Sequence, residues 1–233
     1  MRLTVRHHFD FGADRALIGD DLVRPEAWDA LRTQTSGPFA LAETREEWER
    51  TADAHPELEA RARRIGELLD ARGVTRLASY GVGGATLECW LERSAPGREL
   101  VVTDYAQATV DRLAGIFTEA ECVRHDLLED PPVEAGMHLL HRVDTEFTNA
   151  EWGRVFEGFG RLPVLFVAAG QVDLRGALAE WRKGRRPGAS RAGWVRTRPA
   201  LEALWKRTHD GRAVDVGDLP AWELDPKLTS SGP

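Results

Sequence analysis

Three glycines between an apolar run and a helix-like run could place a ligand against the polypeptide backbone. Gly81, Gly83 and Gly84 follow the apolar run at residues 74–79. Because glycine has no Cβ, the backbone can turn tightly there and come close to a ligand. The helix expected to begin at residue 85 would offer unpaired N–H groups to the same turn. The pattern predicts half of a nucleotide-binding site on a strand–turn–helix unit.

Two carboxylates follow the next two apolar runs. Asp104 lies twenty residues beyond Gly84, after the run at residues 100–103, where a carboxylate can accept both hydroxyls of a ribose. Asp126 follows the run at residues 121–125. Either residue could instead be an ordinary helix cap or turn residue, because Asp favours such positions. Taken with the glycines, the two acids at strand ends favour a nucleotide cofactor.

Polar residues also follow the run at residues 137–143, and these could do acid–base chemistry. Asp144 and Glu146 are the best candidates for a general base, and His141 is the third. Each of them, taken alone, is also explained as a core side chain or a solvated one.

A basic segment at residues 182–198 contrasts with the net charge of −7 of the whole chain. The segment holds seven Lys and Arg residues and no acid. Guanidinium groups suit carboxylate or phosphate recognition, so the segment could bind an anionic substrate; it could equally be a solvated loop that balances an acidic N-terminal segment. The candidates for substrate binding are Arg185, Arg186, Arg191 and Arg196, with Trp194 as an aromatic wall.

The composition limits the classes of protein to which the chain could belong. Its 233 residues suit one domain, or one domain with an N-terminal addition, and 42% apolar residues suffice for a substantial core. The negative net charge argues against a nucleic-acid-binding protein. No apolar run is long enough for a membrane span and the start lacks the apolar stretch of a signal peptide, so a cytoplasmic protein is expected. Cys89 and Cys122 lack metal-type spacing, so neither a disulfide framework nor a zinc site is expected.

The residues that could do chemistry lie on a regular alternation of strands and helices. Strands are expected at residues 74–79, 100–103, 121–125, 137–143 and 163–169, and helices with one apolar face at residues 56–72 and 86–93 and around Val110, Trp152, Leu178 and Leu201. This alternation predicts an α/β fold with a parallel sheet covered on both faces. Two closely spaced final strands, at residues 212–216 and 221–224, predict an antiparallel hairpin at one edge. Thr148 with Glu151 has the spacing of a capping box.

The first 55 residues show no long hydrophobic period and are rich in acids. Short helices are expected at residues 25–32 and 45–54, and the segment could cover a ligand crevice or act as a packing or dimerisation arm. The expected organisation is an N-terminal cap or arm at residues 1–55, an α/β domain at residues 56–226, and a disordered tail at residues 227–233.

Residues 56–224 resemble the class I S-adenosylmethionine-dependent methyltransferases. The resemblance rests on the glycine turn at residues 79–85, on Asp104 in VVTDYAQATVDRL, on Asp126 in CVRHDLLED and on the segment MHLLHRVDTEF. It implies a Rossmann-like, doubly wound, mostly parallel seven-stranded sheet whose last strand is antiparallel. It also implies S-adenosylmethionine as cofactor, S-adenosylhomocysteine as product, and a cofactor site made of Ser79, Tyr80, Gly81, Gly83, Gly84, Asp104, Tyr105, Asp126, Leu127 and Arg142.

The sequence departs from the family pattern at two positions of the glycine turn. Ser79 stands where the family has an Asp or Glu that holds the ammonium end of the cofactor, and Ala85 replaces the third glycine. Either another acid substitutes for the missing one, with Glu47 and Glu49 as candidates, or a bound water does. A degenerate domain that binds no cofactor is the remaining alternative.

The expected function is methyl transfer to nitrogen or oxygen of a small metabolite, of the secondary-metabolism type and anionic if the basic segment binds it. The sequence predicts no metal, nucleic-acid or membrane partner, and it is compatible with a homodimer. Three alternatives stay open: an S-adenosylmethionine-dependent enzyme of non-methyl chemistry, a fold-only binding module, and a nicotinamide oxidoreductase. Asp126 and the lack of a Tyr-x-x-x-Lys pair count against the last of these.

Overall fold

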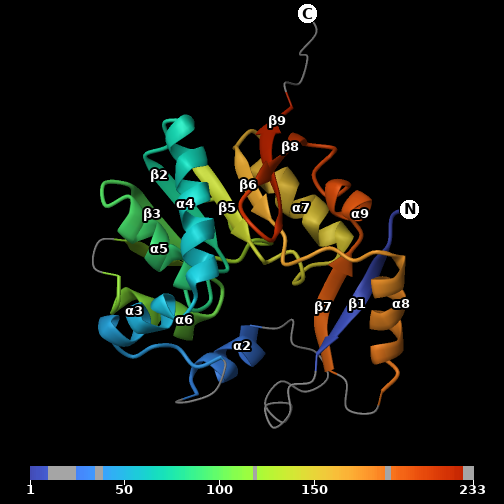
Figure 1. Cartoon of the computed structure of the whole chain (residues 1–233), viewed down its shortest axis with the longest axis horizontal. Helices are drawn as coiled ribbons and strands as arrows, with labels where there is room; N and C mark the ends of the chain where they lie inside the picture. The colour runs from blue at the N-terminus through green and yellow to red at the C-terminus, as the bar shows by residue number, and fades with distance from the viewer. Residues whose placement is uncertain (10–24, 35–38, 118–119, 187–189, 228–233) are drawn as a thin grey trace, which may run out of the picture.

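A seven-stranded sheet forms the centre of the molecule in the computed structural model, which describes residues 1–9, 25–34, 39–117, 120–186 and 190–227 (Figure 1). Its strands stand in the order β4-β3-β2-β5-β6-β9-β8. In chain order they are β2 (Arg76–Tyr80), β3 (Glu99–Asp104), β4 (Glu121–Arg124), β5 (Met137–His141), β6 (Val164–Val167), β8 (His209–Asp215) and β9 (Pro220–Pro226).

The pairing of these strands confirms the predicted fold class. β4, β3, β2, β5 and β6 are parallel, and β9 inserts antiparallel between β6 and β8. All seven occur where the sequence predicts strands, with small shifts at the ends. β6 is buried along its whole length, as the continuous apolar run at residues 163–169 indicates. The sheet is therefore of the doubly wound type, with a terminal antiparallel hairpin.

Helices cover both faces of the sheet, because alternate residues of each strand point to opposite sides. Leu77, Leu139 and Leu165 pack against one set of helices, which are α3 (Arg45–Asp53), α4 (Pro56–Ala71), α5 (Thr86–Ser94) and α6 (Gln107–Ala114). Tyr80, Leu140 and Phe166 pack against α7 (Asn149–Phe159) and α9 (Arg198–Glu202). The carboxyl ends of β2, β3, β4 and β5 meet at one edge, the place where open α/β sheets bind ligands.

A second, two-stranded sheet joins two segments that lie far apart in the sequence. β1 (Thr4–Phe9) pairs antiparallel with β7 (Ser190–Arg196), and α8 (Leu174–Lys183) packs against β1 (Figure 1). Glu180 of α8 holds β1, because its carboxylate accepts from the His8 amide at 3.3 Å and lies 3.1 Å from His7 Nδ1. The prediction of a loop at residues 182–198 is wrong for β7. Neither strand has a clear alternation of apolar and polar residues in the sequence. Each depends on pairing with a distant strand, which a local pattern does not show.

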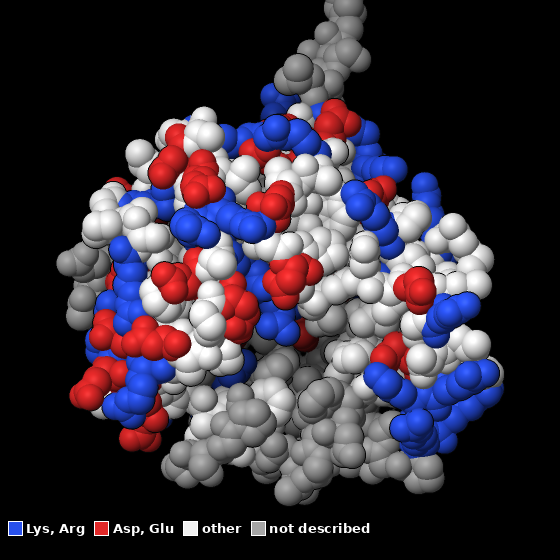
Figure 2. All heavy atoms as spheres, in the orientation of Figure 1, with Lys and Arg blue, Asp and Glu red and all other residues white. Residues whose placement is uncertain are grey.

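The charge of the basic segment is concentrated just beyond this small sheet. Figure 2 shows Lys and Arg side chains gathered at the end of α8, where Arg182, Lys183, Arg185 and Arg186 are all exposed.

In the described part of the chain, no helix has the length and the apolar character that crossing a membrane requires.

The N-terminal segment reaches the edge of the large sheet through α2 (Pro25–Arg32). Asp29 Oδ1 accepts from the Ala108 amide, in the first turn of α6, at 3.1 Å. Both short helices of this segment, α2 and α3, occur where the sequence predicts them. Of the predicted disordered tail, residues 228–233 lie outside the described residues, and the Lys227 amide donates to Thr208 O at 3.0 Å.

Replacing Thr148 by Ala should lower the free energy of unfolding by about 1 kcal/mol. The Thr148 hydroxyl accepts from the Glu151 amide at 3.2 Å, and the Glu151 carboxylate accepts from the Thr148 amide at 2.7 Å, which is the predicted capping box of α7. Urea unfolding followed by circular dichroism measures the loss. Thr51→Ala, at an exposed site in α3, is the control and should change stability by less than about 0.5 kcal/mol. Equal losses in the two variants would contradict a specific capping role.

Candidate functional site

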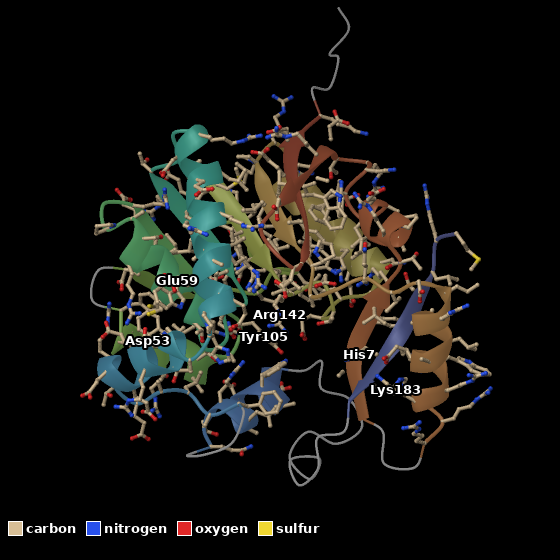
Figure 3. All side chains as sticks on the ribbon, viewed as in Figure 1. His7, Asp53, Glu59, Tyr105, Arg142 and Lys183 are labelled. Atoms are coloured by element: carbon tan, nitrogen blue, oxygen red, sulfur yellow. The ribbon has the colours of Figure 1, made fainter. Side chains whose placement is uncertain are left out.

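A cavity of about 490 Å³ opens at the carboxyl ends of β2, β3, β4 and β5. Figure 3 shows two of its residues, Tyr105 and Arg142, in the space between the sheet and α2. The lining residues are Trp28, Arg32, Leu58, Gly81, Val82, Gly83, Gly84, Ala85, Thr86, Leu87, Glu88, Asp104, Tyr105, His125, Asp126, Leu127, Leu128, His141, Arg142, Val143, Glu146, Phe147 and Glu151. Residues that the sequence places at separate strand ends therefore meet in one cavity.

The glycine turn requires glycine at two positions. Gly81 and Gly83 have φ angles of +64° and +55°, which side chains rarely allow. A Cβ on Gly81 would lie 2.5 Å from Val143 Cγ1, and one on Gly83 would lie 2.7 Å from Arg32 Nη2. Ala85 also has a positive φ, +49°, at the position of the family's third glycine. The turn therefore keeps the left-handed path of a glycine-rich loop in spite of the substitution.

Asp104 is a buried residue of the cavity wall and is only 6% exposed. Its Oδ2 accepts from the Gly83 amide and its Oδ1 from the Ala106 amide, each at 2.9 Å. Burial raises the pKa of Asp104, while the two amides and the Arg32 guanidinium oppose the rise. Each carboxylate oxygen keeps a second lone pair. Asp104 can therefore hold the glycine turn and still accept hydrogen bonds from the hydroxyls of a ligand.

Three more of the predicted cofactor residues line the cavity, namely Tyr105, Asp126 and Leu127. Tyr105 Oη is buried and has no hydrogen-bond partner among the described residues. Burial raises the pKa of Tyr105, so its hydroxyl stays neutral and can donate. Asp126 Oδ1 accepts from the Leu128 amide at 2.9 Å. Asp126 is thus a turn residue as well as a cavity residue, and its two interpretations are compatible.

The prediction that Tyr80 contacts a cofactor is wrong for its side chain. Tyr80 is 1% exposed and points into the core on the α7 face. Its Oη lies 3.0 Å from His138 Nδ1 and accepts from the Val133 amide at 3.2 Å. The reason is the alternation of a strand, because Tyr80 and its neighbour Ser79 point to opposite faces.

Ser79 does not line the cavity itself but contacts a residue that does. The Ser79 hydroxyl donates to Glu88 Oε1 at 2.6 Å, and Glu88, in the first turn of α5, belongs to the lining. Burial raises the pKa of Glu88 to about 7. Glu47 and Glu49, the expected substitutes for the missing acid, form hydrogen bonds at α3 outside the lining. The signal that could have found Glu88 is an acid within one helical turn of the glycines.

Among the three candidate bases, only Glu146 combines a place in the cavity with a pKa near neutrality. Burial raises the pKa of Glu146 to about 7. His141 also lines the cavity, but burial and two guanidinium groups nearby lower its pKa to about 3. Asp144 is 1% exposed and lies outside the lining, where its Oδ1 accepts from the Ala169 amide at 2.6 Å. Asp144 therefore connects the ends of β5 and β6, and the prediction that it is a general base is wrong.

Arg196 has a structural task that the sequence does not reveal. It is buried outside the cavity lining, and its guanidinium donates to Asn149 Oδ1 at 2.8 Å and to the carbonyl oxygens of Asp144 and Phe147. Burial lowers its pKa to about 10, which leaves it charged at neutral pH. Arg196 therefore fixes the loop after β5, contrary to the prediction that it binds substrate.

The other predicted substrate residues of the basic segment also lie outside the cavity lining. Arg185 stacks on Trp181, with Cζ 3.4 Å from the ring centroid, and Arg186 is exposed beyond α8. Trp194 is half-buried, and the guanidinium of Arg6 lies 5.8 Å from its ring centroid. The side chain of Arg191 lies outside the described residues. Arg142, a predicted cofactor residue, does line the cavity; it is exposed and has a φ of +61°.

Trp28 and Arg32 bring the N-terminal segment into the cavity, and no motif in the sequence indicates a role for either residue. Arg32 Nη1 donates to Phe39 O at 3.1 Å, and its Cζ lies 5.1 Å from the centroid of the Trp28 ring. Burial lowers the pKa of Arg32, and the charges of Asp104 and Glu146 oppose the change. Of the roles open to this segment, covering the ligand crevice fits these contacts. No local sequence motif predicts this role, because the directions of the Trp28 and Arg32 side chains depend on the packing of α2 against α6.

The cavity is rich in acids. Its lining contains five carboxyl side chains, those of Glu88, Asp104, Asp126, Glu146 and Glu151, and two guanidinium groups, those of Arg32 and Arg142. Charges are poorly screened in a partly buried site, so this lining favours a cationic ligand over an anionic one. Within the described ranges, no group of three or more His, Cys, Asp or Glu residues is arranged to hold a metal ion.

Comparison with solved structures identifies the fold. Human N-acetylserotonin methyltransferase in complex with SAM is 16% identical over 79% of this chain and 57% of that chain, with a TM-score of 0.59. The mitomycin 7-O-methyltransferase MmcR is 16% identical over 78% of this chain and 57% of that chain, with a TM-score of 0.59. PigF with SAH is 13% identical over 94% of this chain and 66% of that chain, with a TM-score of 0.60.

The chain therefore has the fold of the S-adenosylmethionine-dependent methyltransferases, which confirms the predicted resemblance at the level of the fold. It spans 57% of the length of the first two of these structures. No family model matches the sequence, and no curated protein matches it.

Glu88→Gln should make the ligand-free protein more stable at pH 8, by on the order of 1–3 kcal/mol. The folded-state pKa of Glu88, about 7, is raised above the ordinary value of 4.5 for a Glu side chain, so folding favours the protonated form. The contribution of this group to stability is therefore fully present below about pH 4.5 and is lost as the pH rises through about 7. Gln does not titrate and escapes this loss. Urea unfolding at several pH values measures the difference.

Glu92→Gln is the matched control, one turn further along α5. The Glu92 carboxylate accepts from Arg45 at 2.5 Å and is partly exposed, so this change should be neutral or destabilising by up to about 1 kcal/mol. A Glu88→Gln protein less stable than the parent at pH 8 would show that the Glu88 carboxylate already has a stabilising partner.

Proposed function

We propose that this protein is an enzyme that binds S-adenosylmethionine and catalyses methyl transfer to a small, uncharged acceptor. The observation that carries the proposal is the cavity in which the glycine turn, Asp104 and Asp126 meet at neighbouring strand ends. Asp104 would bind the ribose hydroxyls, and Tyr105, Asp126 and Leu127 would surround the adenine. When bound there, the cofactor supplies an electrophilic methyl group on a sulfonium.

The charge of the cavity supports this cofactor over a dinucleotide. S-adenosylmethionine carries two positive groups, a sulfonium and an ammonium, against one carboxylate. NADH carries a negatively charged pyrophosphate, which a lining with more carboxyl than guanidinium groups disfavours, and increasingly so as Glu88 and Glu146 ionise above about pH 7. The unpartnered Tyr105 Oη offers a hydrogen-bond donor to a purine. Two of the similar structures were solved with SAM and with SAH, which agrees with this choice.

Glu146 is the residue that we expect to face the acceptor. Methyl transfer to oxygen or nitrogen needs a positioned nucleophile and, where the acceptor atom carries a proton, a base to remove it. Glu146 lines the cavity and would take that proton on its carboxylate, since its pKa is about 7. His141, with a pKa of about 3, is a far weaker base.

The lining also indicates the kind of acceptor. Trp28 and Phe147 supply aromatic surface, which suits a planar molecule. The acid-rich lining disfavours the anionic acceptor that the basic segment suggests, and Arg196 is occupied by the loop after β5. An uncharged aromatic compound with an O–H or N–H group is therefore the proposed acceptor class.

Asp104→Asn should weaken the binding of S-adenosylmethionine at least about tenfold, because an amide has one acceptor oxygen in place of two. Calorimetric titration with S-adenosylmethionine, S-adenosylhomocysteine and NADH is the measurement. The parent should bind both adenosyl ligands at about micromolar Kd and should not bind NADH. Asp111→Asn, at an exposed position of α6, should leave all three results unchanged. Parent protein that binds NADH, or binds none of the three, would overturn the proposed cofactor.

Glu146→Gln should lower kcat by about 10²–10⁴-fold and leave the Kd of S-adenosylmethionine nearly unchanged. In the parent the basic form of Glu146 increases as the pH rises, so kcat/KM should climb up to about pH 7 and level off above it. Release of S-adenosylhomocysteine, followed over a panel of phenols and aromatic amines, gives the rates. A variant that keeps the parent's rate and pH profile would exclude Glu146 as the base.

A further inference from the structure

Glu88 is a buried carboxylate without a charged partner. It is 2% exposed, and its hydrogen bonds come from the Ser79 hydroxyl, at 2.6 Å, and from its own backbone amide. Within the described part of the chain, no Lys, Arg or His forms an ion pair with it. Asp104 is the charged group that acts on it across the cavity wall, and that charge is of the same sign.

The other buried carboxylates of the described chain all have stronger partners. Asp104 accepts from two backbone amides, and Asp144 accepts from the Ala169 amide beside the Arg196 charge. Glu180 pairs with Lys183 at 2.6 Å, and Glu223 pairs with Arg72 and Arg212. Glu88 therefore departs from this pattern. Glu146, whose pKa burial also raises to about 7, is the comparable carboxyl of the cavity, but the Arg32 guanidinium interacts with it.

A buried carboxylate whose two donors are both neutral is costly, since burial of an ionised group is offset only by a cation or by several hydrogen bonds. The side chain could be kept neutral by a proton, or its charge could be balanced by a ligand. Glu88 lines the same cavity as the glycine turn, so a ligand bound in that cavity can reach it. This position favours a ligand as the group that balances the charge of Glu88. The guanidinium of Arg32, in that cavity, interacts with Asp104, Tyr105 and Glu146 and does not reach Glu88.

We propose that Glu88, held by Ser79, is the anionic partner of the ammonium group at the amino-acid end of the cofactor. This inference rests on the proposed function. The Ser79 hydroxyl donates to Oε1 and so leaves Oε2 for the ammonium. Ser79 and Glu88 together then perform the task of the single acid that the family has at the position of Ser79.

The proton balance of binding follows from this arrangement. In the ligand-free protein near neutral pH the Glu88 carboxyl carries a proton for much of the time, since its pKa is about 7. The ammonium binds to the carboxylate form, so Glu88 releases its proton to solvent while the ammonium keeps its own protons. Binding of a ligand that lacks the ammonium should release no proton from this group.

The test compares two ligands that share the adenosine part and carry no sulfonium. S-adenosylhomocysteine has the amino-acid end, and 5′-methylthioadenosine lacks it. Glu88→Gln should weaken the binding of S-adenosylhomocysteine at least about tenfold and change the binding of 5′-methylthioadenosine by less than about twofold. Only the first ligand has an ammonium group, which loses its anionic partner in the variant. Ser79→Ala should weaken the first ligand by a smaller factor, because Glu88 keeps its charge but loses its orientation.

Titration near pH 6.5, in two buffers with different ionisation enthalpies, counts the protons released on binding. The parent should release a fraction of a proton more with S-adenosylhomocysteine than with 5′-methylthioadenosine, and Glu88→Gln should abolish the difference. Asp104 faces both ligands through their ribose, so its contribution cancels in the comparison. Glu92→Gln, on the same helix, should behave like the parent.

Two outcomes would overturn the proposal while leaving the proposed function intact. Equal weakening of both ligands by Glu88→Gln would show that Glu88 only supports the turn. Equal affinity of the parent for both ligands, with equal proton release, would show that no group of the protein holds the ammonium. Failure of the parent to bind either ligand would instead overturn the proposed function together with this inference.

Discussion

Parallel pairing of β2 with both β3 and β5 is the interaction on which the site depends. Tyr80, at the end of β2, pairs with Thr103 on one side and with Leu140 on the other. This register sets the glycine turn beside Asp104 and beside the loop after β5, so that three separate segments share one cavity. A slip by one residue would turn every side chain of β2 to the opposite face. Ser79 would then point away from α5, and the contact with Glu88 would be lost.

Several departures from ordinary backbone and electrostatic preferences gather at the cavity. Glu88 and Glu146 have pKa values raised by burial, which means that their charged forms oppose folding. Ala85 and Arg142 both have positive φ angles, a backbone conformation that residues with a Cβ rarely adopt. Such departures persist where surrounding structure enforces them, and they are typical of binding and catalytic sites. Well-packed elements such as β6 and the capped α7 supply the stability that these departures reduce.

The sequence was informative wherever the signal is local. The continuous apolar run of β6, the capping box of α7 and the glycine turn each depend on a few neighbouring residues, and each occurs as predicted. Predictions failed where the outcome depends on a distant partner. Arg196 looked like an anion-binding residue because it lies in a basic segment. Its acceptors include backbone carbonyls on another segment, and the types of the residues there do not reveal this contact. β1 and β7 likewise stabilise each other although they lie far apart in the sequence.

The position of Arg196 in β7 has a consequence for the order in which the molecule assembles. Arg196 holds the loop that carries Glu146, and β7 is completed by β1, whose neighbour Leu3 accepts from the Thr197 amide at 3.0 Å. Closing that contact spans almost the whole chain, and contacts of such long range form slowly. The strand end carrying Asp104 needs only its sequence neighbours β2 and β4. The part of the cavity formed by the glycine turn and Asp104 can therefore become ordered early in folding, whereas the loop that carries Glu146 is fixed only after β1 and β7 have paired.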